Sequence, residues 1–501
     1  MYDYWEPWKE KAARALSDIM KDAGIEEGVT AGEISAETPP DPGMGDIGMP
    51  MFSFAKTLRK GPAQIAQMAA ERLAAEGADA WAQGPYLNVK LDRPAVARAA
   101  LEEVFKGAEK EEGVFPFGRP GTLAGEKVMV EFSSPNTNKP LHLGHLRNDV
   151  IGESVSRILA ACGAEVCKVC IINDRGIHIC KSMLAYKERG GGKTPESEGM
   201  KGDHFVGEWY VDFNKALKKE TEEIPLEAGE KEEARQAKTA VMKKAQDLLR
   251  KWETGDSGTV ALWKKMNAWA IEGMKETYKR TGVSFDKYYF ESETWMLGKE
   301  EVLKGLEKKV FYRKEDGAAA ADLSAEKLDE KILLRGDGTS IYITQDLGLA
   351  VSRHNDWPFD RLIYVVGSEQ QYHFKALFVL LDKLGHPWAK KLRHLSYGMV
   401  NLPEGKMKSR EGTVVDADDL IDSLRDMALA EIRAKEREEE VGDAAEVAEK
   451  IALGALHYYL LQPSPAKDML FDPKESLSFT GNTGPYLQYM GARISSMLRK
   501  A

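Results

Sequence analysis

Cysteine is scarce in this sequence, because the 501 residues include only four: Cys162, Cys167, Cys170 and Cys180. Four cysteines in so long a chain cannot form the dense disulfide framework of a small secreted domain. Long apolar runs are also missing, since the longest candidate, residues 451–461, is too short to span a bilayer. The first residues, Met1 to Glu6, lack the basic and apolar regions of a signal peptide. These absences predict a soluble, cytoplasmic protein.

The chain also lacks an excess of positive charge. Its 70 Lys and Arg face 80 Asp and Glu, which gives a formal net charge of −10. Because non-specific nucleic-acid binding depends on neutralising phosphates, this balance argues against a generic nucleic-acid coat, although it leaves room for a local basic surface. With 43% hydrophobic residues the composition is that of a globular protein, and the length suggests about three domains.

Residues 1–118 are expected to form a small α/β domain. Helical apolar spacing runs from Trp5 to Ala23, a second helix is predicted from Pro62 to Ala75, and residues 86–91 alternate like a strand. Prolines and glycines between Gly113 and Gly125 are typical of a linker.

Residues 119–416 are expected to form a doubly wound parallel sheet of the Rossmann type. A strand at Lys127–Phe132, a helix at Leu141–Gly163 and a strand at Glu165–Ile172 make a strand–helix–strand unit. The pattern returns with a strand at Arg361–Gly367 and a helix at Phe374–Leu384. Residues from about 190 to 280 have little sheet character and are predicted to be an insertion. Residues 417–501 have a helical pattern.

Three short motifs suggest cofactors but do not hold up. Gly43–Gly48 matches the dinucleotide fingerprint, yet prolines rather than a strand precede it. Gly192-Lys193-Thr194 resembles the end of a P-loop, but it follows a predicted helix and the upstream glycine is absent. Cys167 and Cys170 have a metal-ligand spacing, but side chains three apart on a strand face opposite sides. Packing cysteines are therefore favoured over ligands, and no metal site is predicted.

The segment after the first sheet strand carries the strongest chemical signal. It reads Ser133-Ser134-Pro135-Asn136-Thr137-Asn138-Lys139-Pro140-Leu141-His142-Leu143-Gly144-His145. Pro140 suits the first turn of a helix, and His142 and His145, three apart, are expected to share one helix face. Gly144 leaves room for a flat base, and two imidazoles with Lys139 at a helix N-terminus form an anion site suited to phosphate. The alternative is a chance pair of surface histidines.

A second signal lies far downstream, at the end of the apolar stretch Leu395–Leu402. It reads Pro403-Glu404-Gly405-Lys406-Met407-Lys408-Ser409-Arg410-Glu411-Gly412. A glycine-flanked loop with three cations is suited to holding a polyphosphate whose charge shifts during a reaction. Most lysine-rich turns are merely solvated, so the signal gains its weight from the histidine element.

These two segments resemble the HIGH and KMSKS signatures of class I aminoacyl-tRNA synthetases. The closer resemblance is to arginyl-tRNA synthetases, and it extends from about residue 33 to the C-terminus. It is also carried by Ser134-Pro135-Asn136, by Tyr342-Ile343-Thr344-Gln345-Asp346, by Val366-Gly367-Ser368-Glu369-Gln370 and by Gly481-Asn482-Thr483-Gly484-Pro485-Tyr486-Leu487-Gln488-Tyr489.

The resemblance implies an arginine–tRNA ligase with an N-terminal tRNA-contacting domain and a catalytic Rossmann domain. The family activates arginine with ATP to arginyl-adenylate and pyrophosphate, then transfers arginine to the 3′ end of tRNA. The resemblance also implies catalytic roles for His142, His145, Lys139 and Lys406. ATP contacts are implied for His142, Gly144, His145, Lys406, Met407, Lys408 and Ser409. Mg²⁺ is expected to arrive with ATP. L-Arginine, ATP and tRNA are the expected partners of a monomer that contacts no membrane.

For arginine binding, the resemblance assigns Glu291 and Asp346 to the guanidinium, a planar cation that suits bidentate carboxylates. Tyr342 would wall the pocket, and Ser134, Asn136 and Gln370 would hold the amino-acid end. Taken one at a time, Glu291 and Asp346 are more often surface acids, and Tyr342 is more often a core residue.

The chain departs from the family pattern in four places. Ser409 replaces the second lysine of KMSKS, and the resemblance makes Lys139 its substitute. Gln345 stands where arginine is usual, and Phe290 where glycine is usual before Glu291. Relatives continue beyond Tyr489 into a helical anticodon-binding domain, whereas this chain stops at Ala501. We therefore expect ATP and arginine binding but impaired tRNA affinity and charging.

Two other classes of protein remain as alternatives. One is a non-catalytic or charging-deficient tRNA-binding paralogue or fragment, which would have no reason to keep His142, His145 and Lys406 together. The other is a small nucleotidyltransferase, which needs neither the insertion nor the two carboxylates.

Overall fold

The computed structural model describes residues 4–106, 118–225, 229, 231–401, 415–435 and 442–500. The chain forms two compact units, residues 1–121 and 122–501. Of the predicted segments, the loop Lys406–Arg410 and residues 113–117 of the linker lie outside the described residues. Among the described helices none is both long and apolar enough to cross a membrane.

The first unit packs helices against a small antiparallel sheet of order β1-β3-β2. The predicted helices are present, and the strand predicted at residues 86–91 corresponds to β3, which is two residues shorter. It ends at Val89 because Lys90 N–H bonds the carbonyl of Asp79 and Leu91 N–H bonds the carboxylate of Asp46. The elements are α1 (Glu6–Asp22), β1 (Ile47–Pro50), α2 (Ala55–Leu58), α3 (Pro62–Ala75), β2 (Ala80–Gln83), β3 (Tyr86–Val89) and α4 (Arg93–Phe105).

The second unit is organised by a five-stranded parallel sheet of order β11-β10-β4-β5-β6. Chain order runs from β4 outward to β5 and β6 on one side, then returns to β10 and β11 on the other. This reversal is the switch point of a doubly wound sheet, so the carboxyl ends of β4 and β10 border a crevice. The strands are β4 (Lys127–Glu131), β5 (Glu165–Ile172), β6 (Lys287–Phe290), β10 (Arg361–Gly367) and β11 (Leu392–Tyr397).

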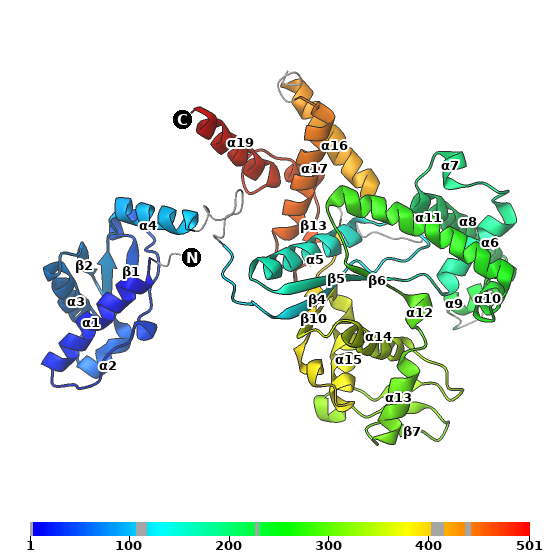
Figure 1. The fold of residues 1–501 in the computed structure, drawn as a ribbon, viewed down its shortest axis with the longest axis horizontal. Coiled ribbons are helices and arrows are strands. Elements are labelled where there is room, and N and C mark those ends of the chain that lie inside the picture. Colours follow the sequence, from blue (N-terminus) through cyan, green and yellow to red (C-terminus); the bar gives the residue numbers. More distant parts are fainter. Residues whose placement is uncertain are drawn as a thin grey trace. The chain divides into compact units, whose positions relative to one another are not determined.

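Helices cover both faces of this sheet (Figure 1). Because side chains alternate along a strand, β4 supplies Met129 to one core and Val128 and Val130 to the other. The first core packs under α13, α14 and α15, and the second under α5, α11, α16 and α17. The helices are α5 (Leu143–Ala161), α11 (Ser257–Thr281), α13 (Gly298–Glu307), α14 (Tyr342–Asp356), α15 (Gln371–Lys383), α16 (Ala417–Ala434) and α17 (Ala444–Leu461).

The predicted insertion is helical and has its own core. Between β5 and β6 the structure places α6 (Ile177–Arg189), α7 (Pro195–Glu198), α8 (Gly202–Glu222), α9 (Glu232–Ala237), α10 (Ala240–Glu253) and α11. Their buried residues include Met183, Phe205, Phe213 and Ala270. Gly192-Lys193-Thr194 lies in the turn between α6 and α7, as the sequence indicates.

The remaining elements are short or lie near the C-terminal end of the chain. They are α12 (Glu291–Thr294), β7 (Tyr312–Arg313), β8 (Ala319–Ala321), β9 (Lys331–Leu334), β12 (Val400–Asn401), β13 (Met469–Leu470), α18 (Pro473–Ser476) and α19 (Gly484–Lys500). Strands β7, β8 and β9 form a second, antiparallel sheet. The segment predicted to be helical also contains β13, which pairs in parallel with β12.

One boundary near the predicted site is wrong. The helix was expected from Leu141 with Pro140 in its first turn, but α5 begins at Leu143. Residues 141–142 precede the helix instead, with His142 extended, because Ala417 N–H bonds the carbonyl of Leu141 and Leu143 N–H bonds the carbonyl of Val415. His142 therefore lies opposite Asp416 in an isolated antiparallel β-bridge.

The four cysteines are free thiols. Cys167 and Cys170 both lie on β5, where Cys170 is fully buried and its pKa is raised by that burial. Cys167 packs against the core under α13, α14 and α15, and Cys180 belongs to the core of the insertion. These positions agree with the interpretation of the cysteines as packing residues.

Candidate active site

A cavity of about 510 Å³ opens at the switch point of the parallel sheet. Its wall is built from the ends of β4 and β10 and the start of α5, with further residues from β11 and β12. The lining includes Ser133, Ser134, Lys139, His142, Gly144, His145, Asn148, Val366, Gly367, Tyr397 and Asn401. Segments far apart in the sequence thus converge where a doubly wound sheet binds ligands.

Two backbone hydrogen bonds orient the histidine pair at this cavity. His142 is the N-cap of α5, and its Nδ1 accepts the backbone N–H of Gly144 at 3.1 Å. His145 lies at the third helical position, and its Nδ1 accepts the backbone N–H of His142 at 3.2 Å. The two ring centroids are 3.9 Å apart. Since each Nδ1 is an acceptor, the proton of each neutral ring sits on Nε2.

Burial keeps both rings neutral at physiological pH. It lowers the pKa of His142 to about 4, with the nearby Lys139 charge adding to the effect, and it lowers the pKa of His145 well below its ordinary value. Burial also lowers the pKa of the Lys139 ammonium. The pair is therefore a set of two fixed N–H donors, beside the positive end of a helix, rather than two cations.

Gly144 has a steric role next to the histidines. A Cβ at this position would lie 3.0 Å from Cε1 of His142 and 3.1 Å from its Nδ1. A larger residue would therefore displace the His142 ring, in addition to narrowing the approach for a flat base.

Asn148, which the sequence gave no reason to select, joins three strand ends at the cavity. Its Oδ1 accepts the backbone N–H of Ser133 at 2.6 Å, and its Nδ2 donates to the carbonyl of Val365 and the hydroxyl of Tyr397. Ser133 and the next residue, Ser134, have φ of 74° and 52°, the left-handed region that L-residues rarely adopt. Asn148 thus helps to hold a strained turn directly after β4.

Arg147 is a second residue that no motif indicated. It is fully buried, and its guanidinium donates to the carbonyls of Gly398, Met399, Pro465 and Lys467. These carbonyls belong to the segment that leads into β12 and to the segment before β13. The only sequence signal for Arg147 was its place in the first turns of the helix that follows the histidines. Which carbonyls its guanidinium binds depends on the tertiary fold.

The two predicted guanidinium carboxylates lie on the other side of the strand ends. Glu291 begins α12 directly after β6, and burial raises its pKa to about 7, with Arg175 lowering it and Asp174 and Asp346 raising it. Oδ2 of the Asp346 carboxylate accepts a hydrogen bond from Nε2 of His373 at 2.6 Å. The fold therefore brings Glu291 and Asp346 into one electrostatic environment.

Arg175 and Asp174 support the turn that carries Glu291. Ser292 donates its N–H and its hydroxyl to Asp174 at 2.8 and 2.7 Å. The guanidinium of Arg175 lies 4.2 Å from the ring centroid of Trp295 and pairs with Glu253 at 2.9 Å. Neither residue was predicted from the sequence.

The other predicted arginine-binding residues are more exposed. Tyr342, the first residue of α14, is 80% exposed, so the alternative that it is a core residue is wrong. Asn136 is exposed and bridges the backbone of Asn173, Gln370 is exposed after β10, and Ser134 is half-buried in the turn after β4. Of these, only Ser134 lines the cavity at the switch point.

The predicted residues Lys406, Met407, Lys408 and Ser409 lie outside the described residues. The described chain on either side of them is close to the histidines, since Asn401 lines the same cavity and Asp416 forms a backbone β-bridge with His142. A second cavity, of about 570 Å³, shares Lys139 and His142 and is otherwise lined by α8 and by Asp416 and Asp419.

Comparisons with known proteins agree with this arrangement. Residues 119–472 match the family described as tRNA synthetases class I (R), catalytic domain, and residues 7–91 match the arginyl tRNA synthetase N terminal domain. Curated arginine–tRNA ligases of Treponema denticola and Treponema pallidum are 58% and 54% identical to the chain. Each match covers 100% of this chain and 82% of the relative. The solved arginyl-tRNA synthetase of Thermus thermophilus superposes with a TM-score of 0.72 and 26% identity, covering 97% of this chain and 81% of that one.

A doubly wound parallel sheet with a histidine pair at its switch point, matched over 119–472, defines a class I aminoacyl-tRNA synthetase. Both domain matches and the identity to the two Treponema enzymes narrow the class further. The chain belongs to the arginyl-tRNA synthetase family.

Proposed function

We propose that the chain is an arginine–tRNA ligase. In the first step the carboxylate of L-arginine attacks the α-phosphorus of ATP, which forms arginyl-adenylate and releases pyrophosphate. In the second step a hydroxyl at the 3′ end of tRNA attacks the acyl carbon and AMP leaves. The observation that carries the proposal is the pair of Nε2 donors fixed at the N-terminus of α5, in a chain that belongs to this family.

For the adenylation step no protein nucleophile is required, so catalysis rests on orientation and charge stabilisation. In our proposal Nε2 of His142 and of His145 donates to the phosphates, and Gly144 allows the adenine to approach the backbone. Lys139 and the loop containing Lys406, Met407, Lys408 and Ser409 contact the polyphosphate. Neutral donors suit this role, because they hold their geometry while negative charge shifts from the α-phosphate to pyrophosphate. ATP brings Mg²⁺ with it.

For arginine recognition we assign Glu291 and Asp346 to the guanidinium. Two carboxylates match its planar fork, and burial around Glu291 strengthens the pairing once the cation is bound. Tyr342 covers the side chain of arginine, and Ser134, Asn136 and Gln370 hold its amino-acid end. The exposure of Tyr342 is consistent with a wall that closes on bound substrate.

For tRNA we assign a contact to the first unit, as part of a cytoplasmic, monomeric enzyme with domains at 1–118, 119–416 and 417–501. A cavity of about 330 Å³ in this unit is lined by Pro39, Pro40, Gln83, Tyr86 and Asn88. An aromatic ring next to amide groups can stack on an unpaired base and bond its edge.

Calorimetric titration with arginine and with citrulline, in the presence of a non-hydrolysable ATP analogue, tests the assignment. Citrulline keeps the shape of arginine and lacks its charge. Binding of arginine alone is expected. Equal binding of both would refute the roles of Glu291 and Asp346, and arginine-independent ATP–pyrophosphate exchange would refute the proposed function.

A further inference from the structure

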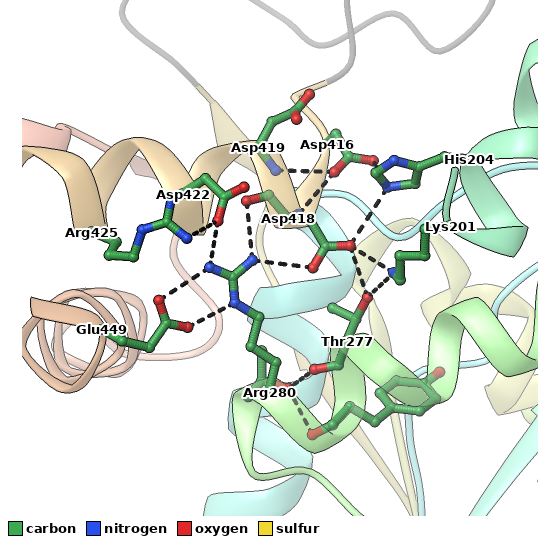
Figure 2. Close-up of polar contacts among 12 residues, drawn as sticks. Lys201, His204, Thr277, Arg280, Asp416, Asp418, Asp419, Asp422, Arg425 and Glu449 are labelled. Carbon is green, nitrogen blue, oxygen red and sulfur yellow. Dashed lines mark hydrogen bonds and ion pairs between the residues drawn. The ribbon is translucent and has the colours of Figure 1, made fainter. Parts of the chain in front are cut away.

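A cluster of ion pairs joins the helical insertion to the chain that flanks His142 (Figure 2). We call it the α8–α16 cluster and define it by Lys201 and His204 of the insertion, Arg280 of α11, and the carboxylates Asp203, Asp416 and Asp418. Lys201 Nζ lies 2.6 Å from Asp418 and 3.1 Å from Asp203. His204 Nε2 lies 3.2 Å from Asp416 and 3.5 Å from Asp418.

The backbone of Asp416 is directly connected to His142. The two residues face each other in an antiparallel bridge, with hydrogen bonds from Leu143 N to the carbonyl of Val415 and from Ala417 N to the carbonyl of Leu141. The Asp416 carboxylate also caps α16, where its Oδ1 accepts the N–H groups of Asp418 and Asp419. A displacement of Asp416 must therefore move the extended segment that holds His142.

The electrostatic connection points the same way. The charge of Asp416 raises the pKa of His142, against the lowering by burial and Lys139, so His142 senses the carboxylate. The carboxylates of Asp416 and Asp418, 3.2 and 3.5 Å from Nε2, raise the pKa of His204 to about 10 despite its partial burial. His204 is thus an imidazolium at physiological pH, facing Asp203 and Lys201 near its own helix, Asp416 and Asp418 on α16, and Arg280 on α11.

The carboxylates of the cluster already have protein cations as partners. Asp203, His204 and Asp418 present ligand atoms within 4.8 Å of one another. However, the Lys201 ammonium already contacts Asp203 and Asp418, and Arg280 contacts Asp418 at 3.4 Å. Arg280 also pairs with Asp422 and Glu449 at 2.6 and 2.7 Å, so these carboxylates already have cationic partners, and the contacts indicate a structural connection rather than a cation site.

We propose that His204 is a positioning residue for adenylate formation: its positive charge holds Asp416, and Asp416 holds His142 in register with the α-phosphate of ATP. The inference rests on the proposed function and extends it, because it makes the geometry of the insertion a determinant of the first chemical step. Its reach is limited to the ATP side, since Glu291 and Asp346 are held by other elements.

The first experiment compares ATP–pyrophosphate exchange, with tRNA present, in His204→Gln, His204→Arg and Asp416→Asn. Glutamine keeps a polar side chain and removes the charge, arginine restores the charge beside a cavity with room for it, and asparagine still caps a helix. We expect kcat to fall about tenfold in the first and third variants. A displacement of about 1 Å can cost roughly a hundredfold in rate, and the shift of His142 transmitted through Asp416 should be smaller than that. The KM for arginine should stay within about twofold, and His204→Arg should recover most of the rate.

Arg425→Gln is the matched control, because Arg425 pairs with Asp422 and Asp426 on the same helix and does not reach His142. It should exchange at the wild-type rate. The double variant His204→Gln/Asp416→Asn should have about the same rate as the slower single variant, since the two residues act in one chain of contacts.

Three results would overturn the proposal. They are a wild-type rate in His204→Gln, an equal loss in His204→Gln and His204→Arg, and a loss of kcat accompanied by a matching rise in the KM for arginine. An inactive wild-type chain would instead count against the proposed function.

A proton NMR titration then tests the contact without any activity. The His204 signal, assigned by its loss in His204→Gln, should titrate near pH 10 and at lower pH in Asp416→Asn. A midpoint near 6.5 in the wild type would overturn the inference.

Discussion

Backbone hydrogen bonds hold both rings of the histidine pair, whereas the two carboxylates of the candidate arginine site depend on side chains from separate elements. His142 and His145 lie three residues apart and receive N–H groups from their own segment. Glu291 and Asp346 lie on α12 and α14, and their surroundings come from Arg175, Asp174 and His373. A site within one segment is encoded locally, while a site between segments is encoded by the whole sheet.

The difference also separates their chemistry. Burial makes the histidines neutral and permanently oriented, which suits donors to a phosphate whose charge changes. Burial leaves Glu291 close to half ionised at neutral pH until a cation arrives. The proposed ATP side is therefore preorganised, and the proposed arginine side is completed by its ligand.

Removal of a histidine donor should have the largest effect. His145→Ala is expected to lower the rate of ATP–pyrophosphate exchange by about 10²–10³, because one preorganised donor contributes roughly 3–4 kcal/mol to the transition state. Arginine affinity, measured by calorimetry, should be unchanged. A comparable loss of arginine affinity would mean that the two sides of the site are not independent.

Neutralisation of a carboxylate should have the next largest effect, and on the other side of the comparison. Glu291→Gln should raise the KM for arginine about a hundredfold, since loss of one partner of a buried charge pair costs roughly 2–5 kcal/mol. The KM for ATP should not change. Glu293→Gln, an exposed glutamate on the same short helix, is the control and should behave as wild type.

The pH dependence of arginine affinity sharpens the comparison. The raised pKa of about 7 at Glu291 means that the carboxylate is mostly protonated at pH 6 and mostly ionised at pH 8. A guanidinium requires the ionised form, so affinity should fall about tenfold from pH 8 to pH 6. Titrations at both values check this, and a flat profile in the wild type would contradict the environment assigned to Glu291. Glu291→Gln should remove the dependence.

A methyl group added at Gly144, next to the histidine pair, should have the smallest effect. Gly144→Ala places a Cβ 3.0 Å from the His142 ring and is expected to slow exchange about tenfold, in line with overpacking costs of roughly 1–3 kcal/mol. Gly491→Ala, a helical glycine with nothing within 4 Å of the added Cβ, is the control. An unaffected Gly144→Ala would show that the ring position is less critical than its hydrogen bonds suggest.

Several elements of the fold could be predicted from the sequence because their signals are local. The strand Arg361–Gly367 and the helix Pro62–Ala75 have the predicted bounds, and β5 spans Glu165–Ile172 as expected. The predicted start of α5 was wrong, because the non-helical conformation of residues 141–142 depends on Val415 and Ala417, which lie far away in the sequence. No local pattern reports a partner that distant.

The sequence by itself determined the family, the strands β4, β5 and β10 of the parallel sheet and the histidine element, because periodicity and short motifs are properties of contiguous residues. Only the tertiary structure decided that Asn148 and Arg147 hold the strand ends, that Glu291 and Asp346 share one environment, and that His204 of the insertion meets Asp416. Such contacts depend on which side chains the folded backbone brings within hydrogen-bond distance. Residue type alone leaves each of them with many possible partners.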